Sequence, residues 1–111
     1  MKRSPIAKRS MSPAAVLRRK LDGQFQEKVC RMGQCEICGS RYNVSGHHIV
    51  PKPRCNGRLK HLRHSAKNGI CLCQSCHVPW AHGDPKQFMV WLKRNRPARH
   101  DWLVKEGGIV E

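Results

Sequence analysis

Acidic residues are scarce in this sequence. Among 111 residues there are 7 Asp+Glu against 22 Lys+Arg, which gives a formal net charge of +15. No acidic residue lies between Glu36 and Asp84, so the region that carries most of the histidines contains no carboxylate. A surface this basic favours a polyphosphate partner, although charge alone is also compatible with a merely soluble basic protein or a ribosomal-type RNA binder.

Long apolar runs and aromatic side chains are scarce as well. Aromatics make up 5% of the residues, and no stretch approaches the length of a transmembrane helix. Residues 1–20 contain basic side chains but no continuous apolar run, which argues against a secretion signal there. The basic segments also have no long apolar face beside them, as membrane attachment would need. We therefore expect a cytoplasmic protein with no membrane partner.

The number of cysteines is 7, which is odd, whereas a secreted disulfide scaffold normally uses an even number. Four of them form two Cys-x-x-Cys pairs, Cys35/Cys38 and Cys73/Cys76. Four thiolates brought together by a fold make a tetrahedral site that suits zinc, and a structural zinc would supply folding free energy that so small a core lacks. Cys71 is an alternative to Cys73 as a ligand. The remaining cysteines are expected to be free thiols: Cys30, Cys55 and, if it does not bind, Cys71.

The chain reads as one domain preceded by an arm. Residues 1–12 mix Lys, Arg, Ser and Pro without periodicity, which predicts a disordered basic arm. Apolar residues recur at spacings of three or four after Pro13, and Asp84-Pro85 has the form of a helix start. The predicted parts of the single domain, residues 13–111, are a helix over 13–30, a metal-binding core over 34–84, a helix over 85–96 and a C-terminal tail over 97–111. Trp102, Leu103 and Val104 of this tail are expected to fold back on the core.

The core is expected to contain a short β-hairpin. Residues 41–45 favour a strand, and Gly46 is expected to interrupt it just before a His-His doublet. Asn68-Gly69 is a turn dipeptide that leads into an alternating strand over 70–73. This second strand is predicted to pair with the segment around the doublet.

The doublet itself, His47-His48, is not needed as a ligand of the four-cysteine site, so it is expected to have a separate function. Neighbouring residues of a strand point to opposite faces, so the two imidazoles cannot both bind one ion without distortion. One can bind a divalent ion while the other faces a substrate as a general base, because an imidazole with a pKa of about 6.5 accepts a proton at neutral pH.

Taken in order, HHIVP, Asn68 and CLCQSCH, framed by the earlier Cys-x-x-Cys, resemble the zinc-containing HNH endonucleases, most of all the small HNH proteins of phages and prophages. The resemblance covers residues 35–84 and implies a small α+β fold. This fold is a ββα-metal (HNH or His-Me) finger, stapled by a four-cysteine zinc site and flanked by N-terminal and C-terminal helices. A bacterial cell or a phage-infected host is implied as the location, with a phage terminase or packaging complex as a partner.

The resemblance also implies a role for each matching residue. His48 would be the general base that activates water, and Asn68 would hold the loop and orient that base by hydrogen bonding. The catalytic ion, Mg²⁺ or Mn²⁺, would be held by His47, His77 and His82. The structural Zn²⁺ would be held by Cys35, Cys38, Cys73 and Cys76.

One spacing departs from the family pattern. The last two histidines of the family commonly lie four residues apart on a helix, whereas His77 and His82 are five apart, roughly 140° around an ideal helix. Three arrangements are compatible with this spacing. Pro79 and Gly83 distort the turn so that the two histidines realign, the metal site keeps only two protein ligands, or Asp84 serves as a further ligand. As further alternatives, His77 replaces a zinc sulfur and His82 caps a helix.

Residues 54–67 form a basic connection that is expected, together with the basic arm, to hold DNA by its phosphates, with little sequence information. Its two histidines, His61 and His64, are expected to be surface or phosphate-contacting side chains. The predicted DNA-binding residues are Arg54, Arg58, Lys60, Arg63 and Lys67.

The implied activity is metal-dependent hydrolysis of a DNA phosphodiester bond, leaving 5′-phosphate and 3′-hydroxyl ends. Low specificity is expected, and a monomer with a single site would nick. The alternatives are a non-catalytic, zinc-stabilised nucleic-acid-binding protein and a degenerate HNH protein retained as a partner of a packaging complex. The order of His47-His48, Asn68 and His77 favours the nuclease, because a passive binder has no chemical need for it.

Overall fold

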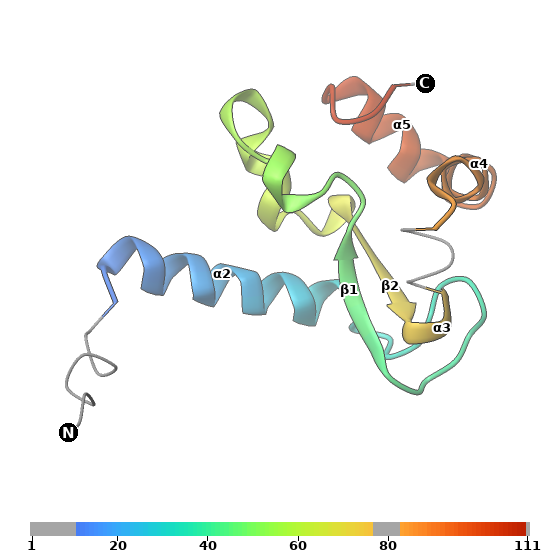
Figure 1. The fold of residues 1–111 in the computed structure, drawn as a ribbon, viewed down its shortest axis with the longest axis horizontal. Helices are drawn as coiled ribbons and strands as arrows, with labels where there is room; N and C mark the ends of the chain where they lie inside the picture. Colours follow the sequence, from blue (N-terminus) through green and yellow to red (C-terminus); the bar gives the residue numbers. More distant parts are fainter. Residues whose placement is uncertain (1–10, 77–82, 111) are drawn as a thin grey trace.

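The computed structural model describes residues 11–76 and 83–110. Two strands form a central hairpin, with helices on either side of it (Figure 1). The elements in chain order are α2 (Pro13–Val29), β1 (Val44–His48), the 3₁₀ helices η1 (Lys52–Arg54), η2 (Gly57–His64) and η3 (Ala66–Asn68), β2 (Gly69–Cys73), α3 (Gln74–Cys76), α4 (Pro85–Asn95) and α5 (Pro97–Lys105). A small α+β fold is thus confirmed.

Helix α2 begins where the sequence predicts. The Ser12 side chain accepts a hydrogen bond from the backbone N–H of Ala15 at 3.1 Å, and a proline fills the first helical turn. Gly23 does not end the helix, which continues to Val29. Phe25 is its one buried residue, whereas Leu17 is 55% exposed. The C-terminal half of α2 therefore packs on the domain, and the N-terminal half projects from it (Figure 1).

The hairpin is antiparallel, as predicted. Val44 lies opposite Cys73 at one end of the ladder, and His48 lies opposite Gly69 at the other. The expected interruption at Gly46 is wrong, because β1 runs through this residue. A Cβ placed there would lie 3.1 Å from Val29, so glycine lets α2 approach the strand without breaking it.

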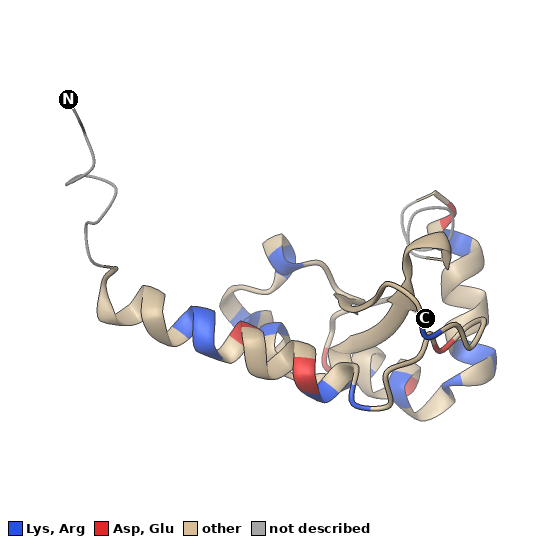
Figure 2. Ribbon diagram, turned by 90° about the horizontal axis from the view of Figure 1, so that it is seen from below, with Lys and Arg blue, Asp and Glu red and all other residues tan. Residues whose placement is uncertain are grey.

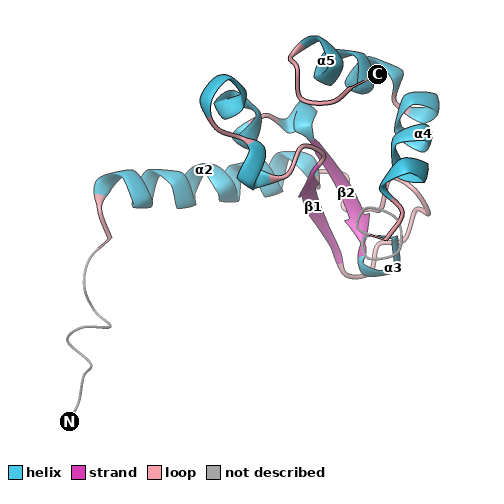
Figure 3. Cartoon of the chain, turned by 45° about the horizontal axis from the view of Figure 1, so that its top comes forward, coloured by secondary structure: helices cyan, strands magenta, loops and turns pink. Residues whose placement is uncertain are grey.

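The two faces of the hairpin pack against different helices. Cβ atoms built on Gly46 and Gly69 would point at α2, which identifies the α2 face. Ile70 belongs to the opposite face and shares a pocket with Phe88 of α4. The sheet is therefore enclosed between α2 on one side and α4 on the other (Figure 3). Helix α5 packs against both α4 and η3.

The C-terminal region contains two helices. Asp84 caps α4 through its side chain, which accepts from the backbone N–H of Gln87 at 3.3 Å, as the Asp84-Pro85 pair predicts. The segment expected as a tail contains α5. Leu92 of α4 and Leu103 of α5 are both 0% exposed, so α5 completes the core.

Basic positions are distributed over several elements of the fold. Figure 2 shows Lys and Arg on α2, on the connection between the strands and on α4 and α5, with only a few acidic positions among them. Within the part of the chain that the structure describes, no helix is both long and apolar enough to cross a membrane.

Candidate metal and catalytic sites

The four cysteines of the two Cys-x-x-Cys pairs meet at one point. Their sulfur atoms all lie within 4.8 Å of one another, and the Cys38 and Cys73 sulfurs are 3.5 Å apart. Cys35 is 1% exposed and Cys76 is 8% exposed. The first pair sits in a knuckle in which the backbone N–H of Ile37 donates to the Cys35 sulfur at 3.4 Å. This geometry is that of a group able to hold a tetrahedral metal ion such as zinc.

The acidity of these thiols fits a metal site. Burial opposes ionisation of Cys35, but hydrogen bonds from the backbone of Cys38, Cys73 and Ile37 outweigh it and lower the pKa of Cys35 to about 6. Burial and the neighbouring sulfurs raise the pKa of Cys76. Without a cation only part of the cluster would ionise at neutral pH. A divalent ion would deprotonate the remaining thiols and balance their charge.

The structure also settles which cysteine of β2 joins the cluster. Cys73 does, whereas Cys71 is a buried thiol outside it. Burial is the main cause that raises the pKa of Cys71 to about 12, and the nearby Cys30 thiol contributes less. Cys55 is buried elsewhere, with its sulfur 3.4 Å from the carbonyl oxygen of Val50. All seven cysteines lie in the described part of the chain, and none is in a disulfide.

His48 ends β1, and its ring lies against α2. The imidazole stacks on Phe25 with a centroid distance of 4.1 Å and an interplanar angle of 9°. Its Nε2 is 2.7 Å from the backbone oxygen of Arg63. A carbonyl oxygen can only accept, so Nε2 carries the proton and Nδ1 is the unprotonated nitrogen of the neutral ring.

The surroundings of His48 favour that neutral ring. Burial lowers the pKa of His48 below its usual value, and the hydrogen bond to the Arg63 carbonyl only partly opposes this. At neutral pH the side chain is therefore able to accept a proton. His48 also borders a pocket of about 460 Å³, together with His47, Lys52 and Phe88.

His47 lies one residue earlier in β1. Its Nε2 is 3.1 Å from the hydroxyl oxygen of Ser45, on the face of the strand opposite to the Phe25 contact of His48. The alternation expected for the doublet is thus present. His77 and His82, the other expected ligands of a catalytic ion, lie outside the described residues.

Asn68 is 0% exposed and joins two backbone segments. Its Oδ1 accepts from the backbone N–H of Val50 at 2.7 Å, and its Nδ2 donates to the carbonyl oxygens of Val50 and Leu62, both at 3.1 Å. The amide therefore ties the segment after β1 to the end of η2. Its hydrogen bonds go to the backbone beside His48 and Arg63, and any effect on the base is indirect.

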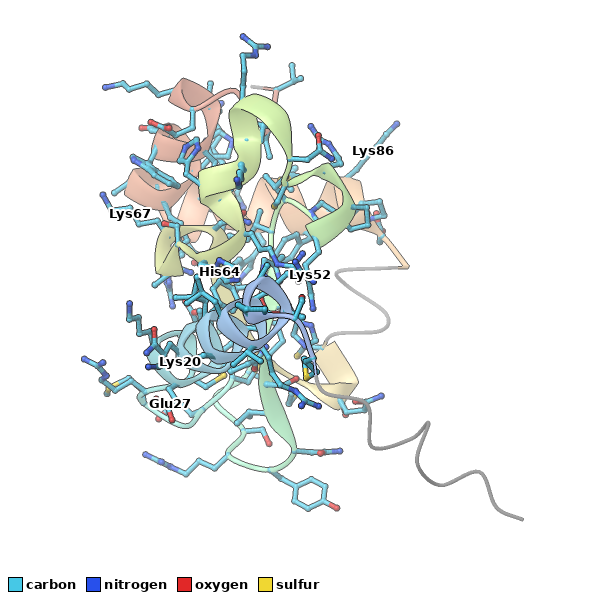
Figure 4. The ribbon with its side chains drawn as sticks, turned by 90° about the vertical axis from the view of Figure 1, so that its left-hand side faces the viewer. Lys20, Glu27, Lys52, His64, Lys67 and Lys86 are labelled. Carbon is cyan, nitrogen blue, oxygen red and sulfur yellow. The ribbon has the colours of Figure 1, made fainter. Side chains whose placement is uncertain are left out.

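The predicted DNA-binding residues occupy several different surroundings. Arg58 and Lys60 are exposed on η2. Arg54 borders the pocket of the histidine doublet and donates to the Gly108 carbonyl at 3.1 Å. Lys67 lies over the Trp102 ring at 5.2 Å and points away from the side of the molecule that carries Lys86 (Figure 4). These residues do not form one continuous surface around the doublet.

Arg63 and the two histidines of the connection are bound to carboxylates. The Arg63 guanidinium donates to Asp22 through Nε at 3.2 Å and through Nη2 at 3.1 Å. His64 Nε2 lies 2.7 Å from the same carboxylate, and His61 Nε2 lies 2.6 Å from Glu106. For His61 and His64 to contact a phosphate, as expected, each would have to give up its contact with a carboxylate of the protein.

Sequence reasoning overlooked Lys52 and two residues of α2. Lys52 is exposed at the pocket of the doublet, two positions before the basic connection was taken to begin. Its place four residues after His48 is the signal that could have identified it. For Asp22 and Phe25 no local signal exists, because their partners lie in other parts of the chain.

A comparison with protein-family models finds a match over residues 35–96, more than half of the chain, to the family described as HNH endonuclease. The matched segment contains the four clustered cysteines, the doublet and Asn68. No curated protein and no solved structure matches the chain.

Proposed function

The chain belongs to the HNH endonuclease family, and from that premise we propose that it hydrolyses DNA phosphodiester bonds with His48 as general base. Cleavage would use one divalent ion, show little sequence specificity and leave 5′-phosphate and 3′-hydroxyl ends. A monomer with one such site would nick a duplex.

The observation that carries this proposal is the state of the His48 ring. Its Nε2–H is engaged by the Arg63 carbonyl, so the nitrogen that accepts a proton from water would be Nδ1. Because burial lowers its pKa, the ring is neutral at the pH at which it must work. As Nδ1 takes the proton, the water oxygen would attack phosphorus opposite the departing 3′-oxygen.

His47, with His77 and His82, would hold the divalent ion. When bound, it would supply positive charge to the departing oxygen. A donor set of imidazoles fits Mn²⁺ or another first-row ion better than Mg²⁺, which prefers oxygen ligands. We therefore expect Mn²⁺ to support more activity than Mg²⁺. The four clustered cysteines would hold Zn²⁺ as a separate, structural ion, because a closed four-sulfur site has no open coordination position.

DNA would be held mainly by its phosphates. Lys52 and Arg54 border the pocket of the doublet and would contact the phosphates next to the cleaved bond. Arg58 and Lys60 would extend this contact along η2. Because each phosphate contact releases counterions, binding should weaken steeply as salt is added.

The test is cleavage of supercoiled plasmid at low salt by the wild type and His48→Ala, with Mn²⁺ and Mg²⁺ titrated in parallel. We expect open-circle product from the wild type and at least a hundredfold lower rate from the variant. Circular dichroism should show that His48→Ala remains folded. If neither protein cuts but both retard the plasmid on a gel, the chain is a nucleic-acid-binding protein and the proposal is wrong.

A further inference from the structure

Helix α2 lies outside the matched segment, yet its Phe25 packs directly against the His48 ring. Phe25 is 1% exposed and its ring stacks on the imidazole. This stacking depends on Gly69, which is paired with His48 across the hairpin. A Cβ at Gly69 would lie 2.9 Å from the Phe25 ring and would collide with Val29. The absence of a side chain at Gly69 thus leaves room for the Phe25 ring on this face of the hairpin.

One residue further along α2, Gln26 holds the strand that carries the histidines. Its Nε2 donates to the Gly46 carbonyl at 2.8 Å, and its Oε1 accepts from the Gly46 N–H at 2.8 Å. Both backbone groups of Gly46 that face α2 are therefore satisfied by one amide. This fixes β1 two residues before His48.

Three residues before Phe25, Asp22 holds the acceptor of the His48 hydrogen bond. Its carboxylate binds both Nε and Nη2 of Arg63, and the pKa of Asp22 is lowered to about 2, chiefly by this hydrogen bond. The carboxylate also lies 2.7 Å from His64 Nε2. With the Arg63 side chain anchored, its backbone carbonyl is fixed where it meets His48 Nε2 at 2.7 Å.

These contacts converge on one ring from one helix face. Positions 22, 25 and 26 are spaced by three and four residues, so Asp22, Phe25 and Gln26 project from α2 in the same direction. We propose that these side chains are positioning residues for His48, which makes α2 part of the catalytic apparatus. The inference rests on the proposed role of His48 as general base.

The contacts act on different degrees of freedom of the base. Phe25 sets the plane of the imidazole, Asp22 sets the carbonyl that selects the Nε2–H tautomer, and Gln26 sets the backbone. A base held in one tautomer and one orientation reacts without first losing rotational freedom. Loosening any of them should lower the rate of the chemical step while leaving the affinity for DNA unchanged.

The first test compares Asp22→Asn and Phe25→Leu with two matched controls. Glu27→Gln removes the same charge from an exposed position of α2, and Leu103→Val trims the core on a different helix, α5. We expect each test variant to lose about tenfold in kcat, at unchanged KM for plasmid, and the controls to lose less than about twofold. In the His48→Ala background the test substitutions should have no further effect.

A second test does not depend on cleavage. Two-bond ¹H–¹⁵N spectra report the tautomer of each histidine, and His48 should be purely Nε2–H in the wild type and in Glu27→Gln. In Asp22→Asn a mixture of tautomers should appear. An unchanged His48 tautomer in Asp22→Asn, or losses of kcat no greater than those of the controls, would overturn the proposal. If the wild type does not cut DNA, the nuclease assignment fails and the spectra alone decide whether α2 positions the ring.

Discussion

Asn68 offers the sharpest test of how the structure is held together. Replacing it by Ala removes the acceptor of the Val50 N–H and the donor to the Leu62 carbonyl, in a site that is 0% exposed. The Val50 carbonyl keeps a contact with the Cys55 sulfur at 3.4 Å and is not counted. The Leu62 carbonyl likewise keeps the backbone N–H of Ser65 as a donor at 3.4 Å, so the Val50 N–H is the group that loses its partner. One stranded buried group gives a loss of about 1.5 kcal/mol in the free energy of unfolding.

This loss is about a tenth to a third of the stability of a small domain, which is about 5–15 kcal/mol. Urea unfolding of Asn68→Ala, followed by tryptophan fluorescence in excess Zn²⁺, should show it directly. Thermal unfolding should show a fall in Tm of roughly 6–12 °C. Asn95→Ala is the matched control: Asn95 is exposed and should cost less than about 0.5 kcal/mol. The reasoning fails if Asn68→Ala costs no more than the control.

Three other substitutions have defined outcomes. Cys38→Ser should lose bound zinc, measured by elemental analysis, and unfold at lower urea, whereas Cys30→Ser should keep its zinc because Cys30 lies outside the cluster. Gly69→Ala should lose about 1–3 kcal/mol by overpacking, while Gly23→Ala, with no atom within 4 Å of its Cβ, should gain about 0.5–1 kcal/mol; thermal unfolding compares the two. The pKa of Asp22 is lowered from 3.8 to about 2, so its carboxylate should make the wild type more stable than Asp22→Asn by about 1 kcal/mol after solvent screening. Urea titrations at several pH values should show this difference in full above pH 3.8, and the difference should vanish as the pH falls toward 2.

Local sequence signals were enough for the features that depend on neighbouring residues. Ser12 before Pro13 and Asp84 before Pro85 predict the helix starts that are observed, because a cap needs only the next turn of the chain. The Cys-x-x-Cys pairs predict the sulfur cluster, since their chemistry suits few other uses.

Features that depend on distant partners were not predictable in this way. Gly46 reads as a strand breaker by propensity, and only the approach of Val29 from α2 explains its place within β1. The pairing of Asp22 with Arg63 joins residues 41 positions apart. For residues 97–111 the sequence predicts that Leu103 folds back on the core, where it is buried, but not the helix α5 that carries it there.

The register of the hairpin places its two kinds of chemistry at opposite ends. Cys73 pairs with Val44 at one end, and Gly69 pairs with His48 at the other, four residues away along each strand. That separation is about 13 Å along a strand, too far for the two sites to share a ligand. An ion beside His47 could leave and be replaced by another while an ion at the cysteine end keeps the chain folded, so one zinc-loaded preparation could be assayed with a series of second metals.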